Sequence, residues 1–258
     1  MTRTLVTTLA WAGDGAAHLR GLMTRMADAA FAAPSLLPGW SRAHVLTHLA
    51  RNADAMINLL DWARTGVPTP AYAAAQQRDH DIEVGAGRDP AAIRDDVVAS
   101  SDRLAVAVRG MPDEAWTVQV GGSGKHAMAA SDIPWLRARE MWVHAVDLDV
   151  GASLADAPAP MLVAVLDDAA ESIGASPHCP PMALEATDLR RRWAVGGAGE
   201  GGGPELAPAV EHIPADDVRR VVVTGTSVQL ATWLLGRSTG RELRTGDGSP
   251  LPAPPRWL

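Results

Sequence analysis

Residues 5–150 contain four long segments in which apolar side chains recur at helical spacing, and proline or glycine separates each segment from the next. The spacing predicts helices over residues 5–30, 42–63, 90–109 and 134–150. Ser41 precedes the second segment as a candidate N-cap, and Asp89 followed by Pro90 is a typical start for the third. A shorter helix is expected near residues 76–81. Four long helices with irregular connections are typical of a four-helix bundle.

The composition changes at residues 151–160, where two prolines, a glycine and a serine interrupt the apolar pattern. We therefore expect one domain over residues 1–153 and a second over residues 154–258. After the boundary the pattern predicts two helices and three strands, the helices at 161–173 and 226–235 and the strands at 182–187, 191–195 and 218–224. The expected fold class is α+β, with a helical bundle followed by a smaller α/β domain.

The composition also narrows the possible partners. The chain has 23 basic and 30 acidic residues, a net charge of −7 and no long basic stripe, so we expect no nucleic-acid partner. No apolar run approaches the roughly 20 residues that span a bilayer, and residues 2–25 lack the apolar stretch of a secretory signal. We therefore expect a cytoplasmic protein without a membrane partner, and the oligomeric state stays open. The single cysteine, Cys179, excludes an intrachain disulfide framework and a cysteine-cluster zinc ribbon.

Glu140 and His144 are the first candidates for chemistry. They lie four residues apart on the fourth predicted helix, so both side chains point from one face. Such a pair can bind a divalent metal through one carboxylate oxygen and one imidazole nitrogen, but a catalytic zinc site needs a third protein ligand. The second helix offers His44 and His48, also four apart, and facing helices of a bundle can bring one of them next to the pair.

The same spacing has two other interpretations, a surface ion pair and a core histidine whose hydrogen bonds are satisfied. The residues around Glu140 are largely apolar, and a carboxylate buried there needs a partner because burying it alone is costly. A metal ion would meet that need, and so would Arg137 or Arg139. Two glycine-rich segments, 121–124 and 196–203, lack the spacing or the following helix of a phosphate-binding loop, so we expect connecting loops there.

Two motifs carry a resemblance to a known family. They are the segment LPGWSRAHVLTHLARNAD at 37–54 and the segment WLRAREMWVHAVDL at 135–148. The chain resembles the mycothiol-dependent maleylpyruvate isomerases, which belong to the DinB-like metal-binding bundles. The resemblance extends over the whole chain and implies a DinB-like four-helix bundle followed by a smaller α/β domain that covers the site. It implies zinc ligands at His48, Glu140 and His144, and it makes His44 a neighbour or packing residue.

The resemblance also implies an activity. Mycothiol is a thiol built on a sugar, and a free thiol with a pKa of ~8.5 is mostly protonated at neutral pH. Zinc with an open position can bind and deprotonate it, and the thiolate can add to the alkene of maleylpyruvate. Bond rotation and elimination then yield the trans isomer, with no need for Cys179. Arg78 and Arg237 are the implied partners of the substrate carboxylates, and His80 and Asp147 are candidate partners of a ligand histidine.

Three functions therefore compete. The first is a zinc- and mycothiol-dependent cis–trans isomerase acting on maleylpyruvate or a similar activated alkene. The second is a mycothiol S-transferase acting on another electrophile, which would need the same metal ligands. The third is a metal- or ligand-binding module without activity, which a closed site with His44 as fourth ligand would favour. Two histidines and a glutamate also suit iron or nickel, so another divalent metal stays possible.

Overall fold

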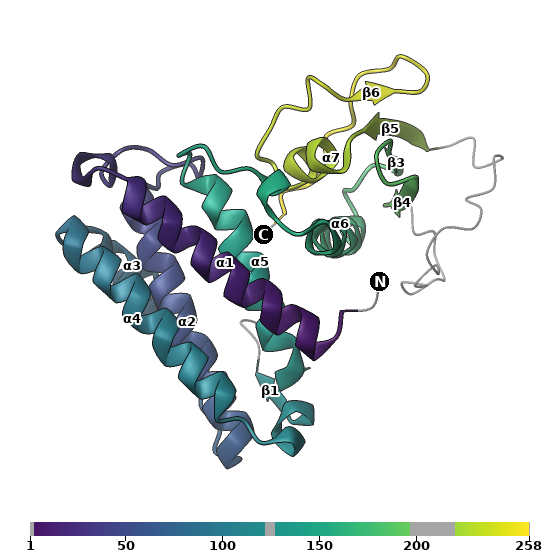
Figure 1. Ribbon diagram of the computed structural model, residues 1–258. Helices are drawn as coiled ribbons and strands as arrows, with labels where there is room; N and C mark the ends of the chain where they lie inside the picture. Colours follow the sequence, from purple (N-terminus) through teal and green to yellow (C-terminus); the bar gives the residue numbers. More distant parts are fainter. Residues whose placement is uncertain (1–2, 122–126, 197–219, 258) are drawn as a thin grey trace. The chain divides into compact units, whose positions relative to one another are not determined.

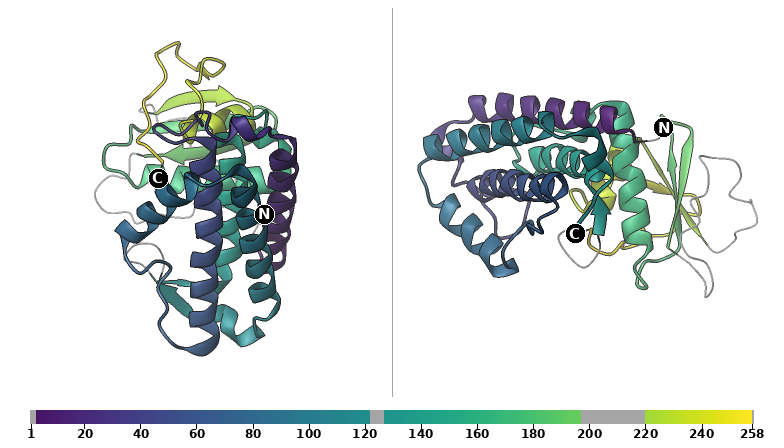
Figure 2. Two further views of the ribbon diagram at one scale, coloured as in Figure 1. Left: turned by 90° about the vertical axis from the view of Figure 1, so that its left-hand side faces the viewer. Right: turned by 90° about the horizontal axis from the view of Figure 1, so that it is seen from below.

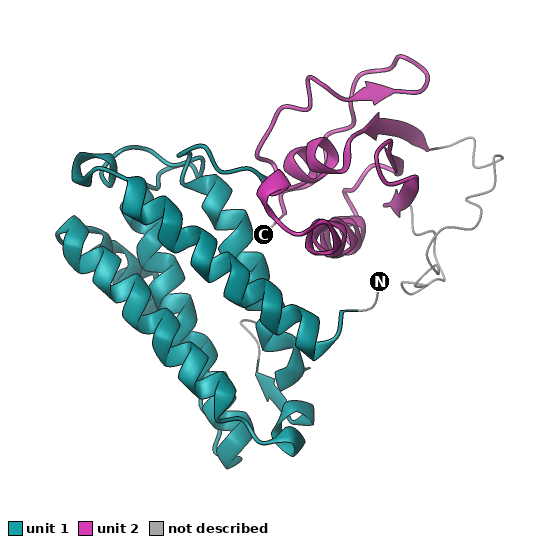
Figure 3. Cartoon of the chain, viewed as in Figure 1, with its two compact units in different colours: residues 1–153 teal, residues 154–258 magenta. Residues whose placement is uncertain are grey.

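The computed structural model describes residues 3–121, 127–196 and 220–257. The chain divides into two compact units, Met1–Ser153 and Leu154–Leu258 (Figure 3). Each unit has its own set of helices and strands. No described helix combines the length and the apolar character that a bilayer crossing requires.

The first unit is a four-helix bundle (Figure 1). Its long helices are α1 (Leu5–Arg25), α2 (Arg42–Thr65), α4 (Pro90–Arg109) and α5 (Ile133–Asp147). α2 packs against α4 and α5, and α1 packs against α5. Figure 2 shows from two further sides that these helices run alongside one another. Buried apolar side chains from the four helices form the core, which confirms the predicted bundle.

The helix boundaries follow from local capping and from one tertiary contact. Ser41 caps α2, because its hydroxyl accepts a hydrogen bond from the backbone N–H of His44. Pro90 starts α4 as predicted, although the Asp89 side chain makes no capping hydrogen bond. The prediction was wrong for the end of α1, which stops at Arg25 rather than residue 30. The guanidinium of Arg94, on α4, donates to the Met26 carbonyl at 2.7 Å and so stabilises the chain where it leaves the helix.

Several shorter elements complete the first unit. α3 (Ala75–Ala86) is longer than the predicted short helix and packs against α2. Strands β1 (Gln119–Gly121) and β2 (Ala127–Ala129) form an antiparallel pair that the sequence did not predict. The glycine-rich segment predicted as a connecting loop lies outside the described residues from position 122 onward. Four short 3₁₀ turns are also described, at Asp28–Ala30, Asp113–Thr117, Ala130–Asp132 and, in the second unit, Leu154–Asp156.

The second unit combines two helices with a four-stranded sheet. The helices are α6 (Ala159–Gly174) and α7 (Ser227–Leu234), and the strands are β3 (Met182–Ala186), β4 (Arg191–Val195), β5 (Val221–Gly225) and β6 (Arg244–Thr245). The strand order is β4-β3-β5-β6, with β3 parallel to β5 and the other pairs antiparallel. Residues 218–219 of the third predicted strand and 197–203 of the glycine-rich segment lie outside the described residues. This unit confirms the α+β class.

Candidate metal centre

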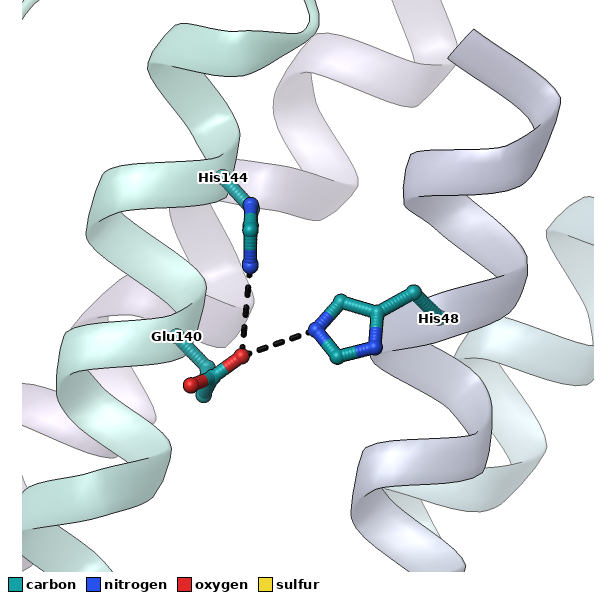
Figure 4. A group of neighbouring side chains, drawn as sticks. All are labelled: His48, Glu140 and His144. Atoms are coloured by element: carbon teal, nitrogen blue, oxygen red, sulfur yellow. Dashed lines mark hydrogen bonds and ion pairs between the residues drawn. The ribbon is translucent and has the colours of Figure 1, made fainter. Parts of the chain in front are cut away.

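Three polar side chains converge between α2 and α5 (Figure 4). His48 extends from α2, while Glu140 and His144 extend from one face of α5, as their spacing of four predicts. Oε2 of Glu140 lies 2.8 Å from Nε2 of His48 and 3.2 Å from Nε2 of His144. One ligand atom from each residue lies within 4.8 Å of the other two. The chain therefore places two imidazole nitrogens and one carboxylate oxygen within 4.8 Å of one another.

The antiparallel arrangement of α2 and α5 produces this convergence. Arg42, at the start of α2, reaches the backbone just after α5, whereas Arg137, near the start of α5, reaches residue 49 in the middle of α2. Between the Arg42 contact and the Arg137 contact, His48 faces the second and third turns of α5. His48 is only 5% exposed, and its ring lies edge-on to that of His144 with centroids 4.8 Å apart. The packing of two buried helix faces therefore fixes the position of all three side chains.

Glu140 is ionised in this environment. Burial by itself would raise the pKa of this carboxyl group. The hydrogen bonds from His144 and His48, together with their charges, outweigh burial and hold the pKa of Glu140 well below its usual value. The side chain therefore offers an anionic oxygen, which is the form in which a carboxylate binds a metal ion.

The two histidines differ in charge. Burial lowers the pKa of His48, and the hydrogen bond to Glu140 compensates for this only in part. For His144, burial also lowers the pKa, but the hydrogen bonds to Asp147 and Glu140 outweigh it and raise the pKa to about 9. Without a metal, His144 therefore carries the positive charge that faces Glu140. A metal ligand must lose such a proton, so a divalent cation bound here would take over its role as the counter-charge of Glu140.

The donor set suits zinc, as it suits other divalent metal ions. Zinc–nitrogen and zinc–oxygen bonds of ~2.0–2.2 Å in a tetrahedron place neighbouring ligand atoms roughly 3.3 Å apart. The two contacts of Glu140, 2.8 and 3.2 Å, are close to that value. Nδ1 of His144 lies 2.8 Å from Oδ2 of Asp147, and a histidine that binds zinc typically donates its other N–H to a carboxylate in this way. Three protein ligands leave one position of the tetrahedron for an external molecule.

His44 does not join this group. Its Nδ1 lies 2.7 Å from the hydroxyl of Ser41 at the start of α2, and its Nε2 lies 3.2 Å from Oε2 of Glu83. These contacts turn the ring toward the helix cap and α3. The arrangement offers no support for a closed site with His44 as a fourth ligand. Of the two candidate partners of a ligand histidine, His80 is exposed on α3, whereas Asp147 contacts Nδ1 of His144.

The two candidate substrate-binding arginines lie in different units. Arg78, on α3, places Nη2 3.4 Å from Nδ1 of His48 and also pairs with Asp79 at 2.8 Å. Arg237 follows α7 in the second unit, with its guanidinium 5.9 Å from the ring centroid of Trp257. The structure therefore brings Arg78 to the cluster, whereas the part of Arg237 in the site stays a prediction.

Two aromatic residues near the cluster were missed by sequence reasoning. The centroids of the Trp40 and His48 rings are 5.6 Å apart, so Trp40 lies beside the cluster. Tyr72 is partly buried, burial raises the pKa of its hydroxyl, and the charges of Arg78 and Glu140 act on it. Trp40 lies within the 37–54 motif and could have been singled out there. Tyr72 lies in an irregular connection before α3, where no periodicity marks it.

The structure also shows where Arg137 and Arg139, the two alternative partners considered for Glu140, make their contacts. Nη2 of Arg139 lies 4.0 Å from Oε1 of Glu140, at the long limit of an ion pair. The guanidinium of Arg137 makes its hydrogen bonds with α2 and α4 instead. Glu140 therefore has the two histidines as its close partners.

Comparisons with known proteins agree with the family resemblance of the sequence. Residues 12–149, more than half of the chain, match the family described as the mycothiol maleylpyruvate isomerase N-terminal domain. Two crystal structures of the mycothiol-dependent maleylpyruvate isomerase are similar over 100% of both chains. One, of a variant in which alanine replaces a histidine, is 28% identical with a TM-score of 0.87, and the other is 30% identical with a TM-score of 0.85. A comparison with curated protein sequences finds no match.

Proposed function

Because the chain belongs to the mycothiol maleylpyruvate isomerase family, we propose that it is an enzyme that uses mycothiol and a divalent metal ion, zinc in the first instance. The proposed reaction is the cis–trans isomerisation of maleylpyruvate or a similar activated alkene. The observation that carries the proposal is that one ligand atom each of His48, Glu140 and His144 lies within 4.8 Å of the other two. This is the three-ligand donor set of a catalytic zinc site with room for an external thiol.

Each polar residue has a defined task in this proposal. His48, Glu140 and His144 hold the metal ion, and Asp147 orients the ring of His144. When bound, the metal supplies a positive charge that lowers the pKa of the mycothiol thiol. Trp40 and the buried faces of α2 and α5 keep the surroundings apolar, which strengthens the attraction between charges in the site.

The substrate is a dianion and needs cationic partners. Arg78 already faces the cluster, and its planar guanidinium can bind a carboxylate through two parallel hydrogen bonds. In the reaction, the mycothiol sulfur forms a bond to one alkene carbon, and the alkene electron pair moves into the adjacent carbonyl. The former double bond rotates as a single bond, and the electron pair returns as the carbon–sulfur bond breaks. We assign Arg237 to the other carboxylate, a role that requires the second unit to cover the site.

The same metal ligands would serve a mycothiol S-transferase, so the substrate decides between these two activities. The position of Arg78 beside His48 favours an anionic substrate and therefore the isomerase. A panel of electrophiles, assayed with and without mycothiol, separates the two. Isomerase activity on maleylpyruvate without net consumption of thiol is expected. Stoichiometric loss of thiol with another electrophile would establish the transferase instead.

The metal site is tested by elemental analysis of the purified protein and of three variants, His48→Ala, Glu140→Gln and His144→Ala. The proposal expects one divalent ion per wild-type chain and a strongly reduced content in each variant. Variants that keep the full content would remove these residues from the metal site. His44→Ala is the matched control, because it also removes an α2 histidine but is expected to leave the metal content unchanged.

A further inference from the structure

Arg137 is a charged residue in the interior of the bundle. Its side chain belongs to α5, one turn before Glu140, and the residue is only 4% exposed. Burial of this kind is costly for a guanidinium unless hydrogen bonds replace the lost water. It lowers the pKa of Arg137 to about 10, which still leaves the group charged at neutral pH. A buried cation retained at this level of the bundle calls for a structural or functional reason.

The hydrogen bonds of Arg137 connect three helices. Nη1 donates to the backbone carbonyl of Leu49 at 2.8 Å and to the side-chain oxygen of Asn52 at 2.8 Å, both on α2. Nη2 lies 3.3 Å from the hydroxyl of Ser101 on α4. Leu49 directly follows His48 in the chain. The guanidinium therefore joins α5 to the backbone of α2 one residue away from a proposed metal ligand.

A second arginine makes an equivalent connection on the other side of the cluster. Arg42, at the start of α2, donates from Nε to the carbonyl of Leu148 at 2.6 Å and from Nη2 to that of Asp149 at 2.7 Å. These carbonyls directly follow α5. Since the two helices are antiparallel, His48, Glu140 and His144 lie between the two connections. The side-chain cluster is thus bracketed by two arginine-to-carbonyl contacts that join the same pair of helices.

We propose that Arg137, together with Arg42, sets the register of α2 against α5 and so positions His48 opposite Glu140 for metal binding. Backbone carbonyls suit this task because, unlike side chains, they cannot move without shifting the helix. The planar fork of arginine can bind acceptors on two helices at once, whereas lysine offers one point charge. This inference rests on the proposed metal site and adds two positioning residues to it.

An alternative role for Arg137 is purely electrostatic. Its charge acts on Glu140, so it could serve only to neutralise that carboxylate. The two roles predict opposite effects when the charge is removed. A neighbouring cation opposes the binding of a metal ion, so its loss would strengthen metal binding if charge alone mattered. Loss of a positioning contact would weaken metal binding, as removal of an outer partner of a metal ligand typically does by 10–100-fold.

The experiment compares Arg137→Met, Arg137→Lys and wild type, with Arg94→Met as control. Arg94 also joins two elements through a backbone carbonyl, that of Met26, but lies away from the cluster in sequence and contacts. Zinc dissociation constants are measured by competition with a chromophoric chelator, well below the unfolding temperature of each variant. Cobalt(II) spectra report the coordination geometry independently. Metal-free crystals of wild type and Arg137→Met, in one crystal form, give the distance from His48 Nε2 to Glu140 Oε2.

We expect Arg137→Met to weaken zinc binding by about 10–100-fold, to alter the cobalt spectrum and to lengthen the 2.8 Å distance beyond hydrogen-bond range. The zinc affinity of Arg137→Lys should fall between those of Arg137→Met and wild type. If Arg137→Met fails to fold, Arg137→Lys provides the test. Arg94→Met should bind zinc like wild type even if it is less stable. Equal or tighter zinc binding by Arg137→Met, or an unchanged distance, would overturn the inference. A wild type that binds no metal would overturn the proposed function alone, because the metal-free distance would still test the register.

Discussion

Nδ1 of His144 lies 2.8 Å from Oδ2 of Asp147, and Asp147 is completely buried. The N–H of that nitrogen donates to the carboxylate, so Nε2 is the nitrogen that faces Glu140. Replacing Asp147 by Asn should keep the shape of the side chain but weaken this orientation. We expect zinc affinity to fall by about 10–100-fold, with the stoichiometry at saturating zinc unchanged.

Competition with a chromophoric chelator measures this affinity. Asp102→Asn is the control, because it removes an exposed α4 carboxylate that pairs with Arg20. An Asp147→Asn protein with wild-type zinc affinity would contradict the role given to Asp147. His144→Ala should lose the bound metal altogether, which separates loss of a ligand from loss of its orientation.

Zinc should also stabilise the folded chain, because the three donors converge only when α2 and α5 are packed together. At a free zinc concentration 100 times the dissociation constant, the gain in unfolding free energy is about 2.7 kcal/mol. For a unit of this size that raises Tm by about 5–10 °C, measured by circular dichroism. Glu140→Gln should abolish the shift, and magnesium, which prefers oxygen ligands, should not produce it. An equal shift in Glu140→Gln would point to zinc bound elsewhere.

Cys179 should be dispensable for activity. It is 7% exposed in the second unit, and burial raises the pKa of its thiol, so little thiolate is present at neutral pH. Cys179→Ser should retain full activity when mycothiol is supplied, and wild type should show almost none when the thiol is omitted. Turnover without added thiol that disappears in Cys179→Ser would instead identify this cysteine as the nucleophile.

The long elements could be predicted from the sequence because they depend on local signals. Apolar periodicity, the Ser41 cap and Pro90 placed the bundle helices, and the four-residue spacing placed Glu140 and His144 on one face. The end of α1 could not be predicted, since the carbonyl of Met26 finds its partner on a helix far along the chain. Three-residue strands such as β1 are too short to show a period.

The candidate site residues also depend partly on local spacing and partly on tertiary contacts. His44 and His48 lie four apart on one helix, so spacing alone cannot decide between them. In the structure His44 contacts Ser41 of its own helix cap and Glu83 of α3, whereas His48 contacts Glu140 of α5. The family resemblance had implied the same choice. The acceptors of Arg137 also depend on which helix faces which, and no local pattern encodes them.

Gly85 controls how closely α3 approaches α2. A Cβ atom at this position would overlap the methyl group of Thr47, the residue before His48. Gly85→Ala should therefore push α3 away, lower the unfolding free energy by about 1–3 kcal/mol and displace Arg78 from the cluster. Urea unfolding measures the stability, and KM reports the position of Arg78.

The double variant Gly85→Ala with Thr47→Ala provides the control. Removing the methyl and hydroxyl groups of Thr47 frees the space that the new methyl group needs, so stability and KM should largely recover. If the double variant shows only the sum of the two single losses, the overlap is not the cause. Gly13→Ala on α1, where a Cβ would meet nothing, should not destabilise the protein.

Arg78 and Arg237 should act on substrate binding rather than on the metal. Arg78 lies 3.4 Å from Nδ1 of His48 with about a third of its side chain exposed, so its fork can turn toward an incoming carboxylate. Losing one charge-assisted contact costs roughly 1.5–3 kcal/mol, or one to two decades in kcat/KM. Steady-state kinetics of Arg78→Ala and Arg237→Ala should show this loss at unchanged zinc content, and Arg64→Ala, an exposed α2 arginine, should behave as wild type. Wild-type kinetics in either variant would remove that arginine from the substrate site. Loss of zinc in Arg78→Ala would show instead that Arg78 acts by holding His48 in place.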